Sequence, residues 1–139
     1  MAKLLNKKSE KQNLEKNSNS TKSSSAHLKY ARVSPYKLRK VADLIRNKNA
    51  VKALLELNLM TQKSSFILSK LVNSCIANAT NNFNLNKNNL IISKIMVNEG
   101  PKLKRMQPRA RGRSFRILKP TAHVIIQMTE KGEPYGAKN

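Results

Sequence analysis

The sequence predicts an α+β fold in which three helices pack on a small antiparallel sheet, with a long protruding basic β-hairpin. Three observations lead to this prediction. Apolar residues recur at helical spacing in three segments between residues 34 and 81. Two segments rich in β-branched residues follow, at 90–98 and 122–129. The 24 residues from Glu99 to Ala122 that join these segments carry eight cations and one acid, so they cannot form core.

We expect the domain to span residues 28–131, between two tails. Residues 1–27 are mainly Lys, Asn, Ser and Glu, with few bulky apolar side chains. Such a segment cannot bury enough surface to offset its ordering entropy, so we interpret it as a flexible basic tail. Residues 132–139 contain two glycines and a proline and are interpreted as a short C-terminal tail.

The domain is predicted to begin with a short strand and a helix. Residues 28–33 alternate in polarity, which indicates the strand. Ser34 and Pro35 then suit a helix start, because serine is a good N-cap and proline needs no N–H at the first helical position. An apolar stripe follows and the helix is expected to end near Asn47; the stripe is Leu38, Val41, Ala42 and Ile45.

Two further helices are predicted before the second strand. The first runs from about Ala50 to Leu59, with Val51, Leu54 and Leu55 facing inward. Thr61 caps the next, which extends to about Asn81. Its stripe is the clearest in the chain and should form the centre of the core: Leu68, Leu71, Val72, Cys75, Ile76 and Ala79.

The basic connection at 99–122 is predicted to be a β-hairpin, because a structureless loop of this length is rare in a small domain. Extended arms of about 11 residues would reach roughly 35 Å. Pro108 to Gly112 is the predicted tip. Arg109, Arg111 and Arg113 alternate, so an extended arm would place all three on one face. The alternative is a disordered basic loop that binds nothing specific.

The charge balance favours a polyanionic partner. The chain has 28 Lys and Arg against 7 Asp and Glu, a net charge of +21, which nucleic acid or an acidic membrane surface would neutralise. Aromatic residues make up only 4%, which disfavours a single-strand binder built on stacking platforms. A hairpin with eight like charges and no core becomes stable when a polyanion surrounds it and counterions are released.

Few residues are present from which to build a catalytic or metal site, so we predict no enzyme activity, no cofactor and no metal. Cys75 is the only cysteine, His27 and His123 are the only histidines, and Asp43 is the only aspartate. Cys75 lies in the third helix's stripe and is interpreted as a buried small apolar residue. His123 is expected to have a structural or RNA-contact role. No run of about 18 apolar residues is present, so no membrane insertion is expected.

The polar face of the first helix has two readings. Side chains off its apolar stripe would either contact phosphates or form a solvated face; these are Tyr36, Lys37 and Lys40. Surface ion pairs are expected between Arg39 and Asp43 and between Asp43 and Arg46.

Several separate motifs resemble one family, the bacterial-type large-subunit ribosomal protein L22 family. They are RVSPYKLR at 32–39 with VADLIR at 41–46, SCIANA at 74–79, VNEGPKLKR at 97–105, PRARGR at 108–113 and ILKPTAH at 117–123. The resemblance covers about residues 28–129, in order. It implies three helices on a small antiparallel sheet with a long hairpin. It also implies a structural constituent of the large subunit that binds large-subunit rRNA and assists assembly.

The resemblance implies particular sites and partners. The hairpin tip would line the nascent-peptide tunnel: Met106, Gln107, Pro108, Arg109, Ala110, Arg111 and Gly112. The rRNA contacts would be Ser34, Lys37, Lys40, Lys102, Lys104, Arg105, Arg109, Arg111, Arg113, Arg116 and Lys119. The partners would be rRNA, neighbouring large-subunit proteins and the nascent polypeptide. The Asn and Lys bias favours the plastid stroma over the bacterial cytoplasm. The alternative function is that of a DNA-compacting, nucleoid-type basic protein.

Overall fold

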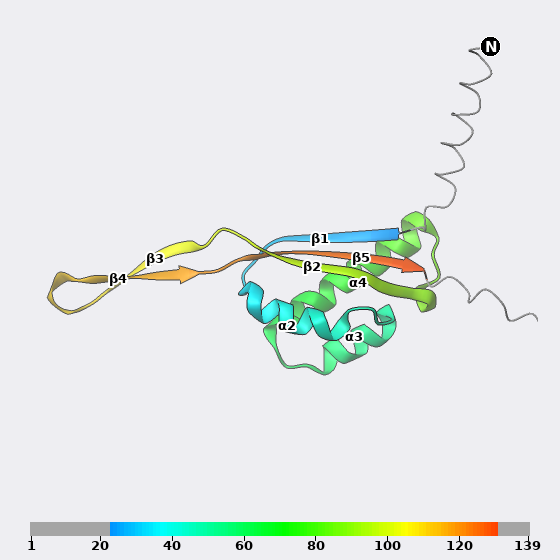
Figure 1. Ribbon diagram of the computed structural model, residues 1–139, viewed down its shortest axis with the longest axis horizontal. Helices are drawn as coiled ribbons and strands as arrows, with labels where there is room; N and C mark the ends of the chain where they lie inside the picture. Colours follow the sequence, from blue (N-terminus) through cyan, green and yellow to red (C-terminus); the bar gives the residue numbers. More distant parts are fainter. Residues whose placement is uncertain (1–22, 131–139) are drawn as a thin grey trace, which may run out of the picture.

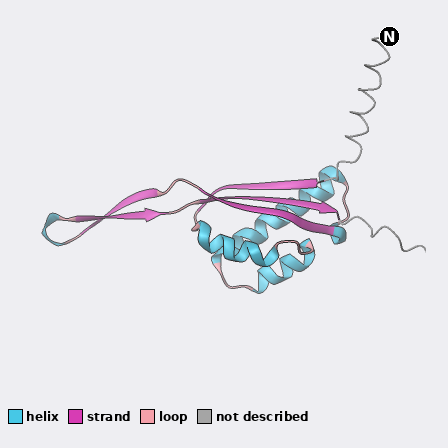
Figure 2. Cartoon of the chain, in the orientation of Figure 1, coloured by secondary structure: helices cyan, strands magenta, loops and turns pink. Residues whose placement is uncertain are grey.

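A computed structural model describes residues 23–130, which form a helix-covered sheet and a projecting hairpin (Figure 1). The main sheet is antiparallel with the order β1-β5-β2, and β3 and β4 form a separate two-stranded sheet. Three helices lie against one face of the main sheet (Figure 2). The bounds are β1 Ser23–Ala31, α2 Pro35–Ile45, α3 Ala50–Leu59, α4 Lys63–Phe83, β2 Leu90–Glu99, β3 Leu103–Pro108, β4 Ser114–Lys119 and β5 Ala122–Glu130. The predicted α+β class is confirmed.

The first strand begins five residues earlier than the domain boundary expected at residue 28. Residues 23–28 pair with 124–129 of β5, so residues 23–27 belong to the sheet and not to the tail. Ser24 and Ala26 are buried against the helices, and such small residues give little apolar signal in a sequence. Tyr30 has a φ of 56°, which ends the simple alternation expected at 28–33. Residues 1–22 and 131–139, which include the rest of the predicted N-terminal tail and the whole predicted C-terminal tail, lie outside the described part of the chain.

Helices α2 and α3 lie close to their predicted positions, but the inward face of α3 differs. Helix α2 ends at Ile45, two residues early, and the N–H of Asn47 donates to the carbonyl of Ile92 on β2 at 3.0 Å. In α3 the fully buried residues are Ala50, Ala53 and Leu57. Of the three residues predicted to face inward, Leu54 is half-buried and packs against the core, and Val51 is half-buried. The prediction is wrong for Leu55, which is 62% exposed, because the two alanines and Leu57 occupy the buried face.

Helix α4 is the centre of the core, as predicted. All six residues of its predicted stripe are buried, and Leu68, Val72, Cys75 and Ala79 have no exposed surface. It starts at Lys63, with Gln62 at the N-cap position in place of the predicted Thr61, and ends where Asn84 takes a left-handed conformation with φ 52°. The hydroxyl of Ser24 donates to the carbonyl of Cys75 at 3.3 Å, which ties the edge strand β1 to this helix.

Strand β5 lies between β1 and β2 and supplies one buried side chain at every second position: Ala122, Val124, Ile126 and Met128. Its ladder with β2 ends at the pair Glu99 and Ala122, which is where the hairpin leaves the domain. None of the helices in residues 23–130 has the length and apolar character needed to span a membrane.

Candidate nucleic-acid interface

The basic segment forms a β-hairpin that projects from the end of the main sheet (Figure 1). Its ladder runs from the pair Leu103 and Lys119 to the pair Pro108 and Ser114. Six paired residues span about 20 Å. The predicted hairpin is confirmed, although its regular arms are shorter than the 11 residues expected, because the remainder forms the neck and the tip. An isolated two-stranded ladder is marginal in water, so this arm depends on surroundings that the domain does not supply.

The neck that joins the hairpin to the domain is a bulged, hydrogen-bonded joint. Three residues, 100–102, separate the two ladders on one arm and two residues, 120–121, on the other. The N–H of Gly100 donates to the carbonyl of Thr121 at 2.9 Å, and the hydroxyl of Thr121 donates to the carbonyl of Pro101 at 2.8 Å. A Cβ on Gly100 would collide with that hydroxyl. The close approach of the two arms therefore requires glycine and fixes where the hairpin starts.

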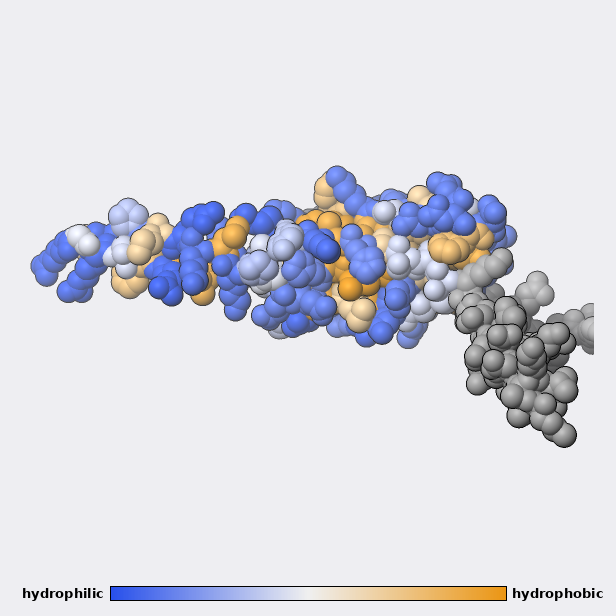
Figure 3. All heavy atoms as spheres, turned by 90° about the horizontal axis from the view of Figure 1, so that it is seen from above, coloured by the Kyte–Doolittle hydropathy of each residue, from blue (hydrophilic) through white to orange (hydrophobic). Residues whose placement is uncertain are grey.

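Cationic side chains lie on both faces of the hairpin. Residues that oppose each other across an antiparallel ladder share a face. Lys104 and Arg116 therefore lie on one face, and Arg105 and Lys119 on the other. Every residue from 104 to 119 is exposed. Figure 3 shows this arm as mainly hydrophilic, with hydrophobic residues interspersed. A partner that neutralises these charges must approach from two sides.

The tip is a tight turn, which overturns the prediction that three arginines share one face of an extended arm. The N–H of Arg109 donates to the carbonyl of Arg113 at 2.8 Å, which closes the turn. Arg111 and Gly112 both have positive φ, 61° and 70°. Arg109, Arg111 and Arg113 do not alternate along one extended strand, because the chain reverses direction between Arg109 and Arg113. The Arg109 guanidinium lies 5.8 Å from the centre of the Phe115 ring.

The predicted contacts on the helix side lie together at the base of the hairpin. Ser34, Lys37, Lys40 and Lys119 line one open groove of about 710 Å³. Arg32 and Lys63 line the same groove and were not predicted from the sequence, because nothing in it brings the start of α4 beside the start of α2. Of the other predicted residues, Lys102 lies by a neighbouring hollow. Lys104, Arg105, Arg109, Arg111, Arg113 and Arg116 lie further out on the hairpin.

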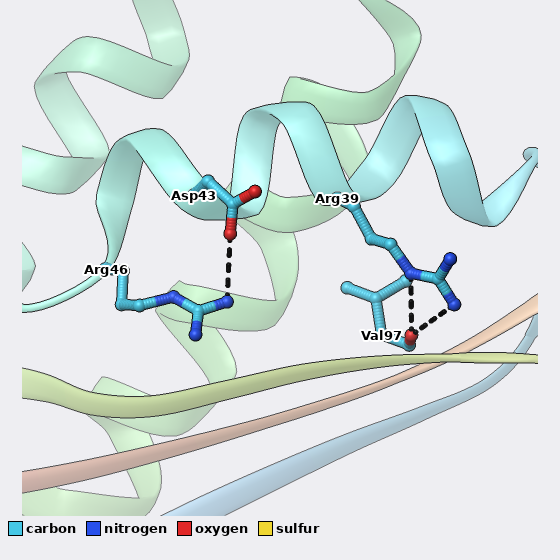
Figure 4. A network of polar contacts seen from close by, with 4 residues as sticks. All are labelled: Arg39, Asp43, Arg46 and Val97. Carbon is cyan, nitrogen blue, oxygen red and sulfur yellow. Dashed lines mark hydrogen bonds and ion pairs between the residues drawn. The ribbon is translucent and has the colours of Figure 1, made fainter.

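Acidic residues neutralise few of these cations. In residues 23–130 the ion pairs are Asp43 with Arg46, at 2.9 Å, and Lys48 with Glu56, at 2.7 Å. The expected pair of Arg39 with Asp43 does not form. The Arg39 guanidinium instead donates to the carbonyl of Val97 on β2 at 3.2 and 3.3 Å, as Figure 4 shows. Neither ion pair involves the hairpin, so its charges remain available to a ligand.

The residues with reactive side chains have structural positions. Cys75 is fully buried, as predicted, and burial raises the pKa of its thiol above the usual range. The Nδ1 atom of His123 accepts a hydrogen bond from the N–H of Tyr30 at 3.0 Å, which holds β1 near its bulge. Within residues 23–130, three or more potential metal ligands do not cluster anywhere. The exposed cations of the hairpin suit this surface to binding an extended polyanion.

The chain is similar to known ribosomal proteins over almost all of this structure. The family model described as "Ribosomal protein L22p/L17e" matches residues 26–129. The protein named large ribosomal subunit protein uL22 of Metamycoplasma arthritidis is 50% identical over 114 residues; the match covers 82% of this chain and 54% of that relative's length. The uL22 protein of Fusobacterium nucleatum is 47% identical over 103 residues, covering 74% and 93% of the two chains.

A relative named uL22c, from Chaetosphaeridium globosum, is 48% identical over 115 residues, which covers 83% of this chain and 97% of the relative. The family match starts within β1 and includes the three helices, the bulged neck and the whole basic hairpin. The comparisons support the ribosomal interpretation and not the nucleoid-type alternative. With its fold, its motifs and these relatives in agreement, the chain belongs to the L22p/L17e family of ribosomal proteins.

Proposed function

We propose that this protein is a structural constituent of the large ribosomal subunit that binds large-subunit rRNA and assists its assembly. One observation carries the proposal: a basic hairpin with cations on both faces is held away from the domain on a fixed neck. A flat polyanion would leave one face unneutralised. A folded RNA with a channel surrounds both faces, so counterions are released from both.

The proposed rRNA contacts divide into two groups. Cations of the hairpin enter the RNA: Lys102, Lys104, Arg105, Arg109, Arg111, Arg113, Arg116 and Lys119. Ser34, Lys37 and Lys40 on α2 contact RNA at the surface of the globular domain. Arginine is suited to the inserted positions because its planar guanidinium binds a phosphate through two hydrogen bonds and stacks on bases.

The hairpin tip is proposed to line the tunnel through which the nascent polypeptide leaves. The segment from Met106 to Gly112 includes the turn at the outer end of the hairpin and is exposed, with Met106 at 76% (Figure 1). The test variant combines Ala110→Cys with Cys75→Ala, so that the only thiol lies at the hairpin tip. A thiol crosslinker on this variant should capture a stalled nascent chain. A matched Asn82→Cys variant at the end of α4 should capture none. Equal capture by the two variants would contradict the tunnel position.

Sedimentation tests the function itself and separates it from DNA compaction. The full chain, expressed in its own cells, should sediment with large subunits at one copy per particle, resist DNase and be released by RNase. Sedimentation with DNA and loss after DNase would contradict the proposal. Neighbouring large-subunit proteins should crosslink to the globular domain and not to the hairpin, since RNA encloses the hairpin.

The compartment proposed is the plastid stroma, on compositional bias alone. Lys outnumbers Arg 20 to 8, as in proteins encoded by AT-rich genomes. The relatives do not favour one compartment, because a protein named uL22 and one named uL22c are almost equally similar to this chain, at 50% and 48% identity. Recovery of the protein with plastid ribosomes would support the proposal, and a source cell without plastids would contradict it.

A further inference from the structure

A groove lies at the base of the hairpin, where three parts of the chain meet. The end of β1, the first turns of α2 and α4 and the last residues of β4 form its walls. Its volume is about 710 Å³, within the usual range of about 300–1,000 Å³ for ligand sites. The groove is therefore large enough for a nucleotide and its flanking phosphates.

Among the described residues, five exposed cations line this groove and no acid does: Arg32, Lys37, Lys40, Lys63 and Lys119. None of the five takes part in the two ion pairs found in residues 23–130. Like charges that converge without a counter-charge repel each other, so the fold gains nothing from this arrangement in the free protein. An anion in the groove removes the repulsion.

The groove also has an apolar wall beside its cations. Leu118 is 49% exposed although it is a large apolar residue, and Pro120 lies next to it. Duplex RNA presents phosphates and sugars outward and keeps its base faces stacked inside. An unpaired nucleotide presents a base face together with its phosphates. Leu118 and Pro120, beside lysines, therefore form a better surface for an unpaired nucleotide than for duplex RNA.

We infer that this neck groove binds an unpaired segment of RNA, with its phosphates on Arg32, Lys37, Lys40 and Lys63 and a base or sugar face on Leu118 and Pro120. The inference rests on the proposed function and names the kind of RNA that the α2 contacts bind, at the junction of the globular domain and the hairpin. It assigns Arg32 and Lys63, neither of which is among the rRNA contacts that the resemblance implies, to RNA binding.

The charge test uses the full chain with Arg32→Gln and Lys63→Gln together. A matched control carries Lys52→Gln and Lys87→Gln, two exposed lysines on α3 and on the turn before β2. The probes are a 12-nucleotide uridine RNA and a 12-base-pair RNA duplex. Relative to the control, the groove variant should bind the single strand about tenfold more weakly and lower the magnitude of the salt slope by about 1.4. The two variants should bind the duplex equally.

A second variant tests the apolar wall without removing charge. Leu118→Ala should weaken single-strand binding by about threefold and leave the salt slope unchanged, because no phosphate contact is lost. Leu59→Ala, at a residue 85% exposed on α3, is its control and should bind as the parent does. Equal binding by Leu118→Ala and Leu59→Ala, or equal losses on the single strand and the duplex, would overturn the assignment to unpaired RNA.

A hairpin variant separates failure of this inference from failure of the proposed function. The variant Lys104→Gln with Arg116→Gln removes two charges from one hairpin face. If it loses binding to large-subunit rRNA while the groove variant matches its control, the groove inference is wrong and the proposed function stands. If neither variant loses binding to that rRNA, both are wrong.

Discussion

The neck of the hairpin gives the sharpest prediction about stability. In Gly100→Ala, the added Cβ would collide with the Thr121 hydroxyl and lie 3.1 Å from Nε2 of His123. Thr121 is 3% exposed, so its hydroxyl cannot turn into solvent to make room. Overpacking costs about 1–3 kcal/mol. Loss of the hydrogen bond from Thr121 to Pro101 adds about 0.5–1.5 kcal/mol. We expect the free energy of unfolding to fall by about 1.5–4.5 kcal/mol.

A double-mutant cycle shows whether the collision is the cause. Thr121→Ala removes the hydroxyl and should cost about 1 kcal/mol alone. In the double variant the methyl group occupies the space that the hydroxyl leaves, so the combined loss should be smaller than the sum of the single losses. The rescue should be partial, because His123 remains close.

The assay is urea denaturation followed by circular dichroism, with Gly112→Ala as the glycine control. Gly112 has φ +70°, and a Cβ added there would meet no atom within 4 Å, so its substitution strains the tip without crowding the neck. Its coupling to Thr121→Ala should be zero. A loss below about 0.5 kcal/mol for Gly100→Ala, within the range of ordinary surface substitutions, would refute the reasoning, as would strict additivity with Thr121→Ala.

Three further predictions concern the domain. Leu68→Ala should lower the free energy of unfolding by about 2–5 kcal/mol, and Leu55→Ala by no more than about 0.5 kcal/mol; equal losses in denaturant melts would show that the core is misassigned. A chain starting at Ser23 should have the same melting temperature as the full chain. One starting at His27 should have a lower melting temperature, because it loses the buried residues Ser24 and Ala26. Equal melting temperatures for the two shortened chains would mean that the start of β1 does not stabilise the fold. Burial raises the pKa of the Cys75 thiol in the folded protein, so the thiol of the unfolded chain ionises at a lower pH. The free energy of unfolding should therefore fall as the pH rises from the usual thiol range toward the raised pKa. Cys75→Ala should lose less stability over that range, and parallel pH profiles of the two proteins would contradict this.

The sequence predicts the elements whose apolar residues form a long, regular pattern. The stripe of α4 and the β-branched runs of β2 and β5 are found where expected. The stripe has one dominant helical period, and the two runs are dense in β-branched residues. Helix α3 has leucines and alanines on several sides, so its inward face depends on how closely it approaches α4. The start of β1 has serine and alanine where a core strand usually has valine or isoleucine, and only pairing with β5 identifies it.

The candidate site was predictable in composition and less so in geometry. The eight cations of the hairpin are evident from residues 99–122, but their division between two faces depends on the ladder register. The turn at Arg111 and Gly112 could be foreseen only at the glycine, because arginine carries no preference for positive φ. Residues 32–40, 62–64 and 118–120 together line the neck groove, and no local sequence pattern predicts that these three segments lie side by side.

Salt titration of one variant tests the central claim, that the hairpin binds by insertion into folded rRNA, most directly. The full chain with Arg109→Gln, Arg111→Gln and Arg113→Gln should keep the parent's melting temperature, since these side chains are exposed at the tip. On folded large-subunit rRNA the magnitude of its salt slope should fall by up to about one unit for each arginine. The loss of affinity should be much smaller on random duplex DNA, which offers no channel. Equal losses on the two nucleic acids would contradict the account.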